Sequence, residues 1–174
     1  MVFQGGDQKL RAMMGEEQYR LLLRTMERNG ELHRHPEPLN EADAAVLRAA
    51  LAPVLRDLAA AGLSLPDVRE EVHEDREWSV CAFIRDPGGT GQGISVMRER
   101  SFAEQVWELA GQVQQWATDI QVDPERPSQW PLCPEHRRAH ALGADFRSDT
   151  AVWVCPETDR AVALIGALIP TPDR

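Results

Sequence analysis

The stretch Trp130-Pro131-Leu132-Cys133-Pro134-Glu135-His136-Arg137-Arg138-Ala139-His140 places one thiol and two imidazoles close together, and Cys155-Pro156 supplies a second thiol further along. Two thiolates and two imidazoles suit a tetrahedral zinc ion. Each cysteine is followed by a proline, so two separate turns would present the ligands from two sides of the ion. The sequence therefore predicts a zinc site formed by Cys133, His136, His140 and Cys155.

This predicted zinc site has a structural rather than a catalytic character. Four protein ligands leave no open coordination position, which is typical of structural zinc. The segment that carries them, residues 124–174, is also short for a self-supporting core, so metal binding would contribute folding free energy. We expect residues 124–174 to form a small zinc-ribbon-like module.

Two alternatives to the four-ligand site remain open on the sequence alone. Cys133 and Cys155 would serve as buried apolar thiols if both histidines lie on a polar loop. If His140 is not a ligand, Asp145, Asp149 or a water molecule would take the fourth position. A water ligand would permit metal-assisted catalysis.

The N-terminal third has helical patterns. Apolar residues recur at helical spacing from Asp7 to Asn29, with Gly15 as a candidate break. Asn40 is a good N-cap for a second helix, Gly62 is its expected end, and Pro53 should kink or restart it. The expected apolar face of the second helix comprises Val46, Leu47, Ala50, Leu51, Val54 and Leu58.

The central segment changes to short β-type runs, at Val68–Glu74, Trp78–Arg85 and Ile94–Met97. The glycine-rich stretch 86–93 between the last two runs predicts a hairpin loop. A third helix begins at Ser101, where Ser101 and Glu104 form a capping box. The apolar face of this third helix comprises Val106, Leu109, Val113, Trp116 and Ile120.

These patterns predict an α+β protein in three segments. Residues 1–66 form a helical region. Residues 67–123 form a β-hairpin and an amphipathic helix, and residues 124–174 form the zinc-ribbon-like module.

Other chemically suggestive residues have simpler interpretations. Gly88–Gly93 lacks the Lys-Ser or Lys-Thr of a phosphate-binding loop and lies between two strand-like runs, which favours a turn. His33 and His35 fit a solvated loop better than a second metal site. The acidic run Asp67–Glu77 fits an exposed strand face, and Cys81 fits a core thiol.

Composition limits the partners and the compartment. The formal net charge is −9, and residues 67–127 carry 13 acidic against 6 basic groups, so the chain should repel nucleic acid. No export signal is visible, and the three cysteines suit metal binding or burial in a reducing compartment. The longest apolar stretch, Ala161–Ile169, is interrupted by Gly166 and is too short for a membrane span. We expect a cytoplasmic protein without a membrane segment.

The region from Trp78 to Leu168 resembles a family of small uncharacterised actinobacterial proteins. These carry W-P-x-C-P-x-H, a later histidine step and W-x-C-P, and this chain has W-P-L-C-P-E-H, H-A-L and A-V-W-V-C-P-E-T, preceded by G-G-T-G-Q-G. The resemblance implies that Cys133, His136, His140 and Cys155 occupy the pattern positions of the family. Ala141 stands where that family usually has proline. The resemblance implies no reaction.

Three functional hypotheses follow. The first is a non-enzymatic cytoplasmic protein, stabilised by structural zinc, that acts as an interaction or adaptor module for an unknown protein partner, with a homo-oligomer left open. The second is a metal-dependent enzyme with an open zinc site. The third is a nucleic-acid-binding ribbon, which the acidic charge disfavours.

Overall fold

The structure, a computed structural model, describes residues 11–28, 39–69, 78–89, 91–120, 129–136 and 140–169. The chain divides into two compact units, residues 1–36 and residues 37–174. His33, His35, most of the acidic run and the predicted helix end at Asn29 lie outside the described residues.

The first unit contains helix α2, Glu16–Arg28. Residues 11–14 are also helical, and Gly15 adopts a φ of 81° between the two pieces, which confirms the predicted break. Met13 and Leu21, both on the predicted apolar side, are exposed. Amphipathic patterning identifies a face that can be buried, but it does not supply the surface that would bury it.

The second unit begins with helix α3, Glu41–Ala60. Asn40 caps it as predicted, because its side-chain oxygen accepts a hydrogen bond of 3.0 Å from the Asp43 amide. The helix does not restart at Pro53 but continues through it. Burial of the residues on both sides, from Leu47 to Leu58, outweighs the loss of one backbone donor. Val46, expected on the apolar face, is exposed.

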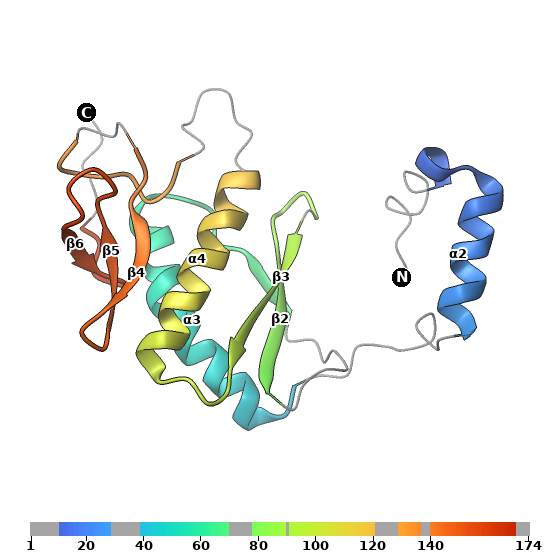
Figure 1. Cartoon of the computed structure of the whole chain (residues 1–174), viewed down its shortest axis with the longest axis horizontal. Helices are drawn as coiled ribbons and strands as arrows, with labels where there is room; N and C mark the ends of the chain where they lie inside the picture. Colours follow the sequence, from blue (N-terminus) through green and yellow to red (C-terminus); the bar gives the residue numbers. More distant parts are fainter. Residues whose placement is uncertain are drawn as a thin grey trace. The chain divides into compact units, whose positions relative to one another are not determined.

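Two three-stranded antiparallel sheets complete this unit (Figure 1). The first has the order β1-β2-β3, and the second has the order β4-β5-β6. Their bounds are β1 Asp67–Arg69, β2 Ser79–Arg85, β3 Gly91–Met97, β4 Gly143–Arg147, β5 Thr150–Val154 and β6 Ala161–Leu164. The mixed α+β architecture predicted from the sequence is confirmed.

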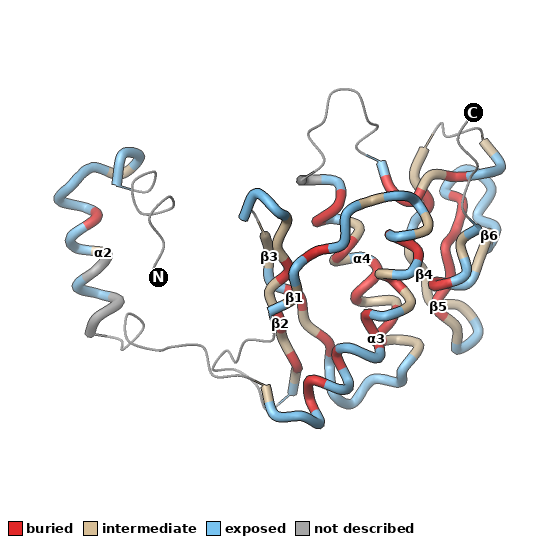
Figure 2. The backbone as a smooth tube through the Cα atoms, turned by 180° about the vertical axis from the view of Figure 1, so that it is seen from behind, coloured by how far each residue is buried: buried red, intermediate tan, exposed pale blue. Residues whose placement is uncertain are grey.

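Helices α3 and α4, Phe102–Ile120, lie between the two sheets, as the opposite views in Figures 1 and 2 show. Side chains on the inner face of β2, such as Val80 and Ile84, are buried. One continuous hydrophobic core joins both helices, β2 and β3 to residues of the C-terminal segment. The second sheet therefore packs on a core that it shares with the rest of the unit.

The predicted β-hairpin is confirmed, with Ser79 opposite Met97 and Arg85 opposite Gly91. Strand β3 starts three residues earlier than the sequence predicted, at Gly91 instead of Ile94. A Cβ at Gly91 would lie 2.2 Å from the Ile84 carbonyl oxygen, so glycine permits the close backbone approach.

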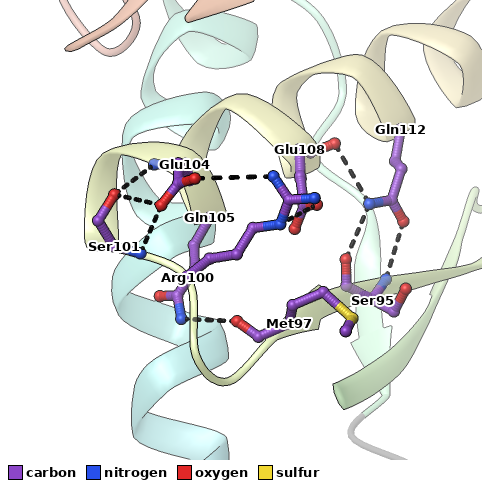
Figure 3. Close-up of polar contacts among 8 residues, drawn as sticks. All are labelled: Ser95, Met97, Arg100, Ser101, Glu104, Gln105, Glu108 and Gln112. Atoms are coloured by element: carbon purple, nitrogen blue, oxygen red, sulfur yellow. Dashed lines mark hydrogen bonds and ion pairs between the residues drawn. The ribbon is translucent and has the colours of Figure 1, made fainter. Parts of the chain in front are cut away.

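Helix α4 is fixed by side-chain hydrogen bonds to backbone groups. The predicted capping box is present: the Ser101 amide donates to Glu104 Oε2 at 2.8 Å, and the Glu104 amide donates to Ser101 Oγ at 3.3 Å (Figure 3). The Gln112 amide group both donates to the Ser95 carbonyl and accepts from the Ser95 amide, each at 2.8 Å. Gln112 thus forms hydrogen bonds with the backbone N–H and C=O of Ser95 on the edge strand β3, as a neighbouring strand would.

A buried carboxylate attaches the C-terminal segment to α3. Asp57, 1% exposed, accepts hydrogen bonds from Trp153 Nε1 at 2.7 Å, the Gly166 amide at 2.6 Å and the Leu168 amide at 2.9 Å. Gly166 has a φ of 96°, and a Cβ there would lie 2.7 Å from the Pro53 side chain. The sequence alone did not reveal this structural role of Asp57.

The C-terminal segment shares its hydrophobic core with helices α3 and α4. Trp130, Leu142, Trp153 and Ile165 all belong to the core that also contains α3 and α4. The Trp130 and Trp153 rings meet edge to face, with centroids 5.4 Å apart. Packing on the helices supplies burial that the segment could not supply alone.

Replacing Asp57 with asparagine should lower the free energy of unfolding by about 2–4 kcal/mol, since an amide can face only part of this buried donor set and carries no charge. Urea denaturation monitored by circular dichroism measures the loss. Asp67→Asn provides the matched control, because Asp67 is exposed and pairs only with Arg69 at the surface in the described contacts; its effect should stay within about 0.5 kcal/mol. Equal stabilities of the two variants would contradict the proposed attachment.

Candidate metal centre

The first pair of candidate ligands is placed by a short backbone ladder. Leu132 and Ala141 form an isolated antiparallel bridge. The Cys133 amide donates to the His140 carbonyl at 3.0 Å, and residues 134–136 form a turn between them. Cys133 and His140 are therefore held opposite each other, and His136 projects from the turn.

The fourth candidate ligand, Cys155, follows β5 directly. The Cys155 amide donates to the Arg160 carbonyl at 3.0 Å, and the Asp159 amide donates back to the Cys155 carbonyl at 2.9 Å. Asp159 has a φ of 55°, which closes this turn before β6. Trp153, two residues earlier on β5, carries the hydrogen bond to Asp57, so the strand that ends at Cys155 is anchored in the core.

The structure brings the four predicted residues together. One ligand atom from each of Cys133, His136, His140 and Cys155 lies within 4.8 Å of the others. His136 Nδ1 is 3.4 Å from both sulfurs, and His140 Nε2 is 3.4 Å from Cys155 Sγ. These residues can hold a metal ion with two sulfur and two nitrogen ligands.

The two thiols are inaccessible to solvent, yet their acidities differ. Burial raises the pKa of Cys133, and backbone hydrogen bonds from His136 and Glu135 offset this only in part. Burial also raises the pKa of Cys155, but hydrogen bonds from Thr158, from the Glu157 backbone and from His140 outweigh it and bring the pKa to about 6. One sulfur of the site is thus a thiolate at neutral pH before any metal binds.

The predicted substitutes for His140 point elsewhere. The Asp145 carboxylate contacts Arg147 Nε at 2.7 Å, and hydrogen bonds from Arg147 and from the Phe146 amide lower the Asp145 pKa. Asp149 lies in the exposed turn between β4 and β5. Because His140 joins the cluster, the described residues give no reason to place a carboxylate of β4 in the fourth position.

Sequence reasoning missed one residue at this site, Glu157. Its Oε2 lies 3.5 Å from His136 Nε2, and its Oε1 lies 3.3 Å from His140 Nδ1. A signal was present, since both turns carry Cys-Pro-Glu, at residues 133–135 and 155–157. Only the second glutamate faces the histidines; Glu135 Oε1 lies 3.8 Å from Arg160 Nη1.

The other candidate sites have structural roles. Residues 86–89 include a turn between two antiparallel strands and precede no helix, so the turn interpretation is confirmed. Cys81, expected to be a core thiol, is instead half-buried on β2 outside the hydrophobic core, with its sulfur 3.6 Å from Ser79 Oγ. The described part of the acidic run, Asp67–Arg69, is an edge strand of the first sheet with both end residues exposed, as expected.

The chain matches no protein-family model, no curated protein and no solved structure. The resemblance to the actinobacterial proteins stays a prediction. Among the described residues, no helix combines the length and apolar character needed to cross a bilayer.

Metal affinity should increase with pH. Between about pH 6.5 and pH 8, Cys155 is ionised and Cys133 is protonated, so each bound ion displaces one proton and the apparent affinity rises about tenfold per pH unit. Below a pH of about 6, Cys155 is protonated as well as Cys133, so each bound ion displaces two thiol protons and the affinity should fall more steeply. Competition between the protein and a chelator for Zn²⁺ measures this; a constant affinity across the range would contradict the assigned thiol states.

Proposed function

We propose that Cys133, His136, His140 and Cys155 bind one structural zinc ion and that the protein is a non-enzymatic, zinc-stabilised interaction module. The observation that carries this proposal is the convergence of four donor atoms within 4.8 Å. All four come from two turns that backbone hydrogen bonds define, and two of the four are fully buried sulfurs.

The spacing of the donor atoms supports zinc in particular. With Zn–S bonds of about 2.3 Å and Zn–N bonds of about 2.05 Å, a tetrahedral ion holds sulfur and nitrogen ligands about 3.5 Å apart. The three sulfur-to-nitrogen distances of 3.4 Å agree with this value. Thiolate and imidazole donors also disfavour the hard ions Mg²⁺ and Ca²⁺, which prefer oxygen ligands.

The segment around the site supports a zinc-ribbon-like module. Cys133 and His140 lie next to the short bridge between Leu132 and Ala141. Cys155, on the other side of the site, lies at the end of β5. Two turns that face one ion in this way are the arrangement expected from the two Cys-Pro steps. We therefore extend the proposal to a ribbon-like module that packs on α4 and contains the second sheet.

A structural role is favoured over catalysis because four protein ligands fill the tetrahedral sphere. An interaction role is supported by three large exposed apolar side chains around one end of the β2–β3 hairpin: Trp78, Met97 and Phe102 are 56%, 41% and 57% exposed. The Trp78 carbonyl accepts a hydrogen bond from the Arg98 amide, which places it beside Met97. Trp, Met and Phe are enriched at protein interfaces.

The partner of this surface would be another protein, and a second copy of the chain is one candidate. Retention of two thiolate ligands requires a reducing compartment, so we also propose a cytoplasmic location. The acidic net charge of −9 makes nucleic acid an unfavourable partner.

Purified protein should contain one zinc ion per chain. Cys133→Ser and Cys155→Ser should each reduce this content severely, because either change removes a thiolate ligand. Cys81→Ser is the matched control, since Cys81 lies on β2 outside the cluster, and it should retain one zinc ion. Elemental analysis of the three variants and the wild type gives the answer. A wild-type chain that binds no zinc after expression with added zinc would refute the proposal.

Cobalt substitution separates the structural site from an enzyme with an open position. Co²⁺ in a closed site of two sulfurs and two nitrogens should give an intense visible spectrum that azide or cyanide leaves unchanged. Anions that shift the spectrum at millimolar concentrations would indicate an open coordination position and favour the metal-dependent enzyme. The measurement requires the folded full-length chain and no knowledge of a substrate.

A further inference from the structure

We propose that Glu157 is a positioning residue that holds both ligand histidines at once, one with each carboxylate oxygen. This inference rests on the proposed metal site and assigns a function to a residue outside the four ligands. Its basis is that both imidazoles turn one nitrogen toward sulfur and the other toward Glu157.

The His136 ring spans the gap between the sulfurs and the carboxylate. Its Nδ1 lies 3.4 Å from the sulfurs of both Cys133 and Cys155. Its Nε2, on the far side of the ring, lies 3.5 Å from Glu157 Oε2. His136 is therefore oriented to bind the metal through Nδ1 and to donate the Nε2 proton to the carboxylate.

The His140 ring has the opposite orientation. Its Nε2 lies 3.4 Å from Cys155 Sγ, and its Nδ1 lies 3.3 Å from Glu157 Oε1. This Nδ1 is buried and makes no hydrogen bond to the described residues, so the nearby carboxylate is the acceptor within reach. His140 is thus oriented to bind the metal through Nε2.

A single carboxylate can serve both rings because it has two oxygens and is an acceptor only. A neutral imidazole has one N–H and one lone pair, and an acceptor at one nitrogen fixes the proton there and leaves the other free for the metal. Such partners also fix the ring plane and raise the basicity of the ligand. Glu157 would accept the N–H proton of two ligand histidines at once, one protonated at Nε2 and the other at Nδ1.

Glu157 lies in the same turn as the candidate ligand Cys155. Glu157 comes two residues after Cys155, and its backbone is one of the groups that hydrogen-bond the Cys155 sulfur. The sulfurs face inward, whereas the side chains of His136, His140 and Glu157 are 27%, 17% and 60% exposed. The carboxylate therefore closes the site on its solvent side.

The test compares zinc affinity in the full chain by competition with a chelator. Glu157→Ala should bind zinc about 10- to 100-fold more weakly, the usual effect of losing an outer partner of a ligand histidine. Glu157→Gln should lose less, because its amide oxygen can accept from one of the two imidazoles. Since Glu157 is largely exposed, both variants should keep the far-UV circular dichroism spectrum of the wild type.

Glu135→Gln is the matched control. It removes the same charge from the equivalent position of the other Cys-Pro-Glu turn, but Glu135 lies near Arg160 and contacts neither imidazole in the described contacts. Its affinity should stay within about twofold of the wild type, since the Glu135 carboxylate lies near Arg160 and a charge that contacts no ligand contributes little. Equal losses of zinc affinity in Glu135→Gln and Glu157→Gln would mean that only the net charge matters, and this would overturn the proposal.

Histidine ¹⁵N spectra of the zinc-loaded protein give a second readout. We expect one histidine protonated at Nε2 and one at Nδ1, and a weaker or exchanging N–H signal for both in Glu157→Ala. Two ligand histidines of the same tautomer would overturn the proposal. If the wild type binds one zinc ion and Glu157→Ala binds it equally well, only the role of Glu157 fails; if the wild type binds none, the zinc site fails as well.

Discussion

Two turns of the C-terminal segment bring together four side chains that can hold a metal ion. Two sulfurs without solvent exposure and two imidazole nitrogens converge within 4.8 Å, and one of the sulfurs is ionised at neutral pH. A buried thiolate is unfavourable unless hydrogen bonds or a cation balance its charge. One ion of charge +2 would neutralise two thiolates and satisfy both imidazoles. Such an ion would link the residues around Cys133 to the end of β5.

The scaffold around the site shows how this convergence is possible in a short segment. Asp57 on α3 binds Trp153 of β5 and the backbone after β6, so the second sheet is fixed to the helices without the metal. Gln114 of α4 donates to the carbonyls of Trp130 and Leu142, on the two sides of the first turn. The helices thus set the positions of both turns, and the metal would lock them to each other.

The sequence predicted those features whose physical cause is local. The capping box at Ser101, the N-cap at Asn40, the hairpin and the four-residue cluster all follow from residue type and spacing, because each needs only neighbouring residues or a shared ion. Asp57 and Glu157 could not be found in the same way. The role of Asp57 depends on contacts with residues about a hundred positions away, and that of Glu157 depends on the direction of two rings. A buried acid within a helix gives no local signal of its distant donors.

X-ray absorption spectroscopy at the zinc edge of the purified full-length protein tests the central claim most directly. We expect a first shell of two sulfurs at about 2.3 Å and two nitrogens at about 2.05 Å, with outer-shell scattering from imidazole. A first shell made only of oxygen and nitrogen, or a sample without bound zinc, would contradict it.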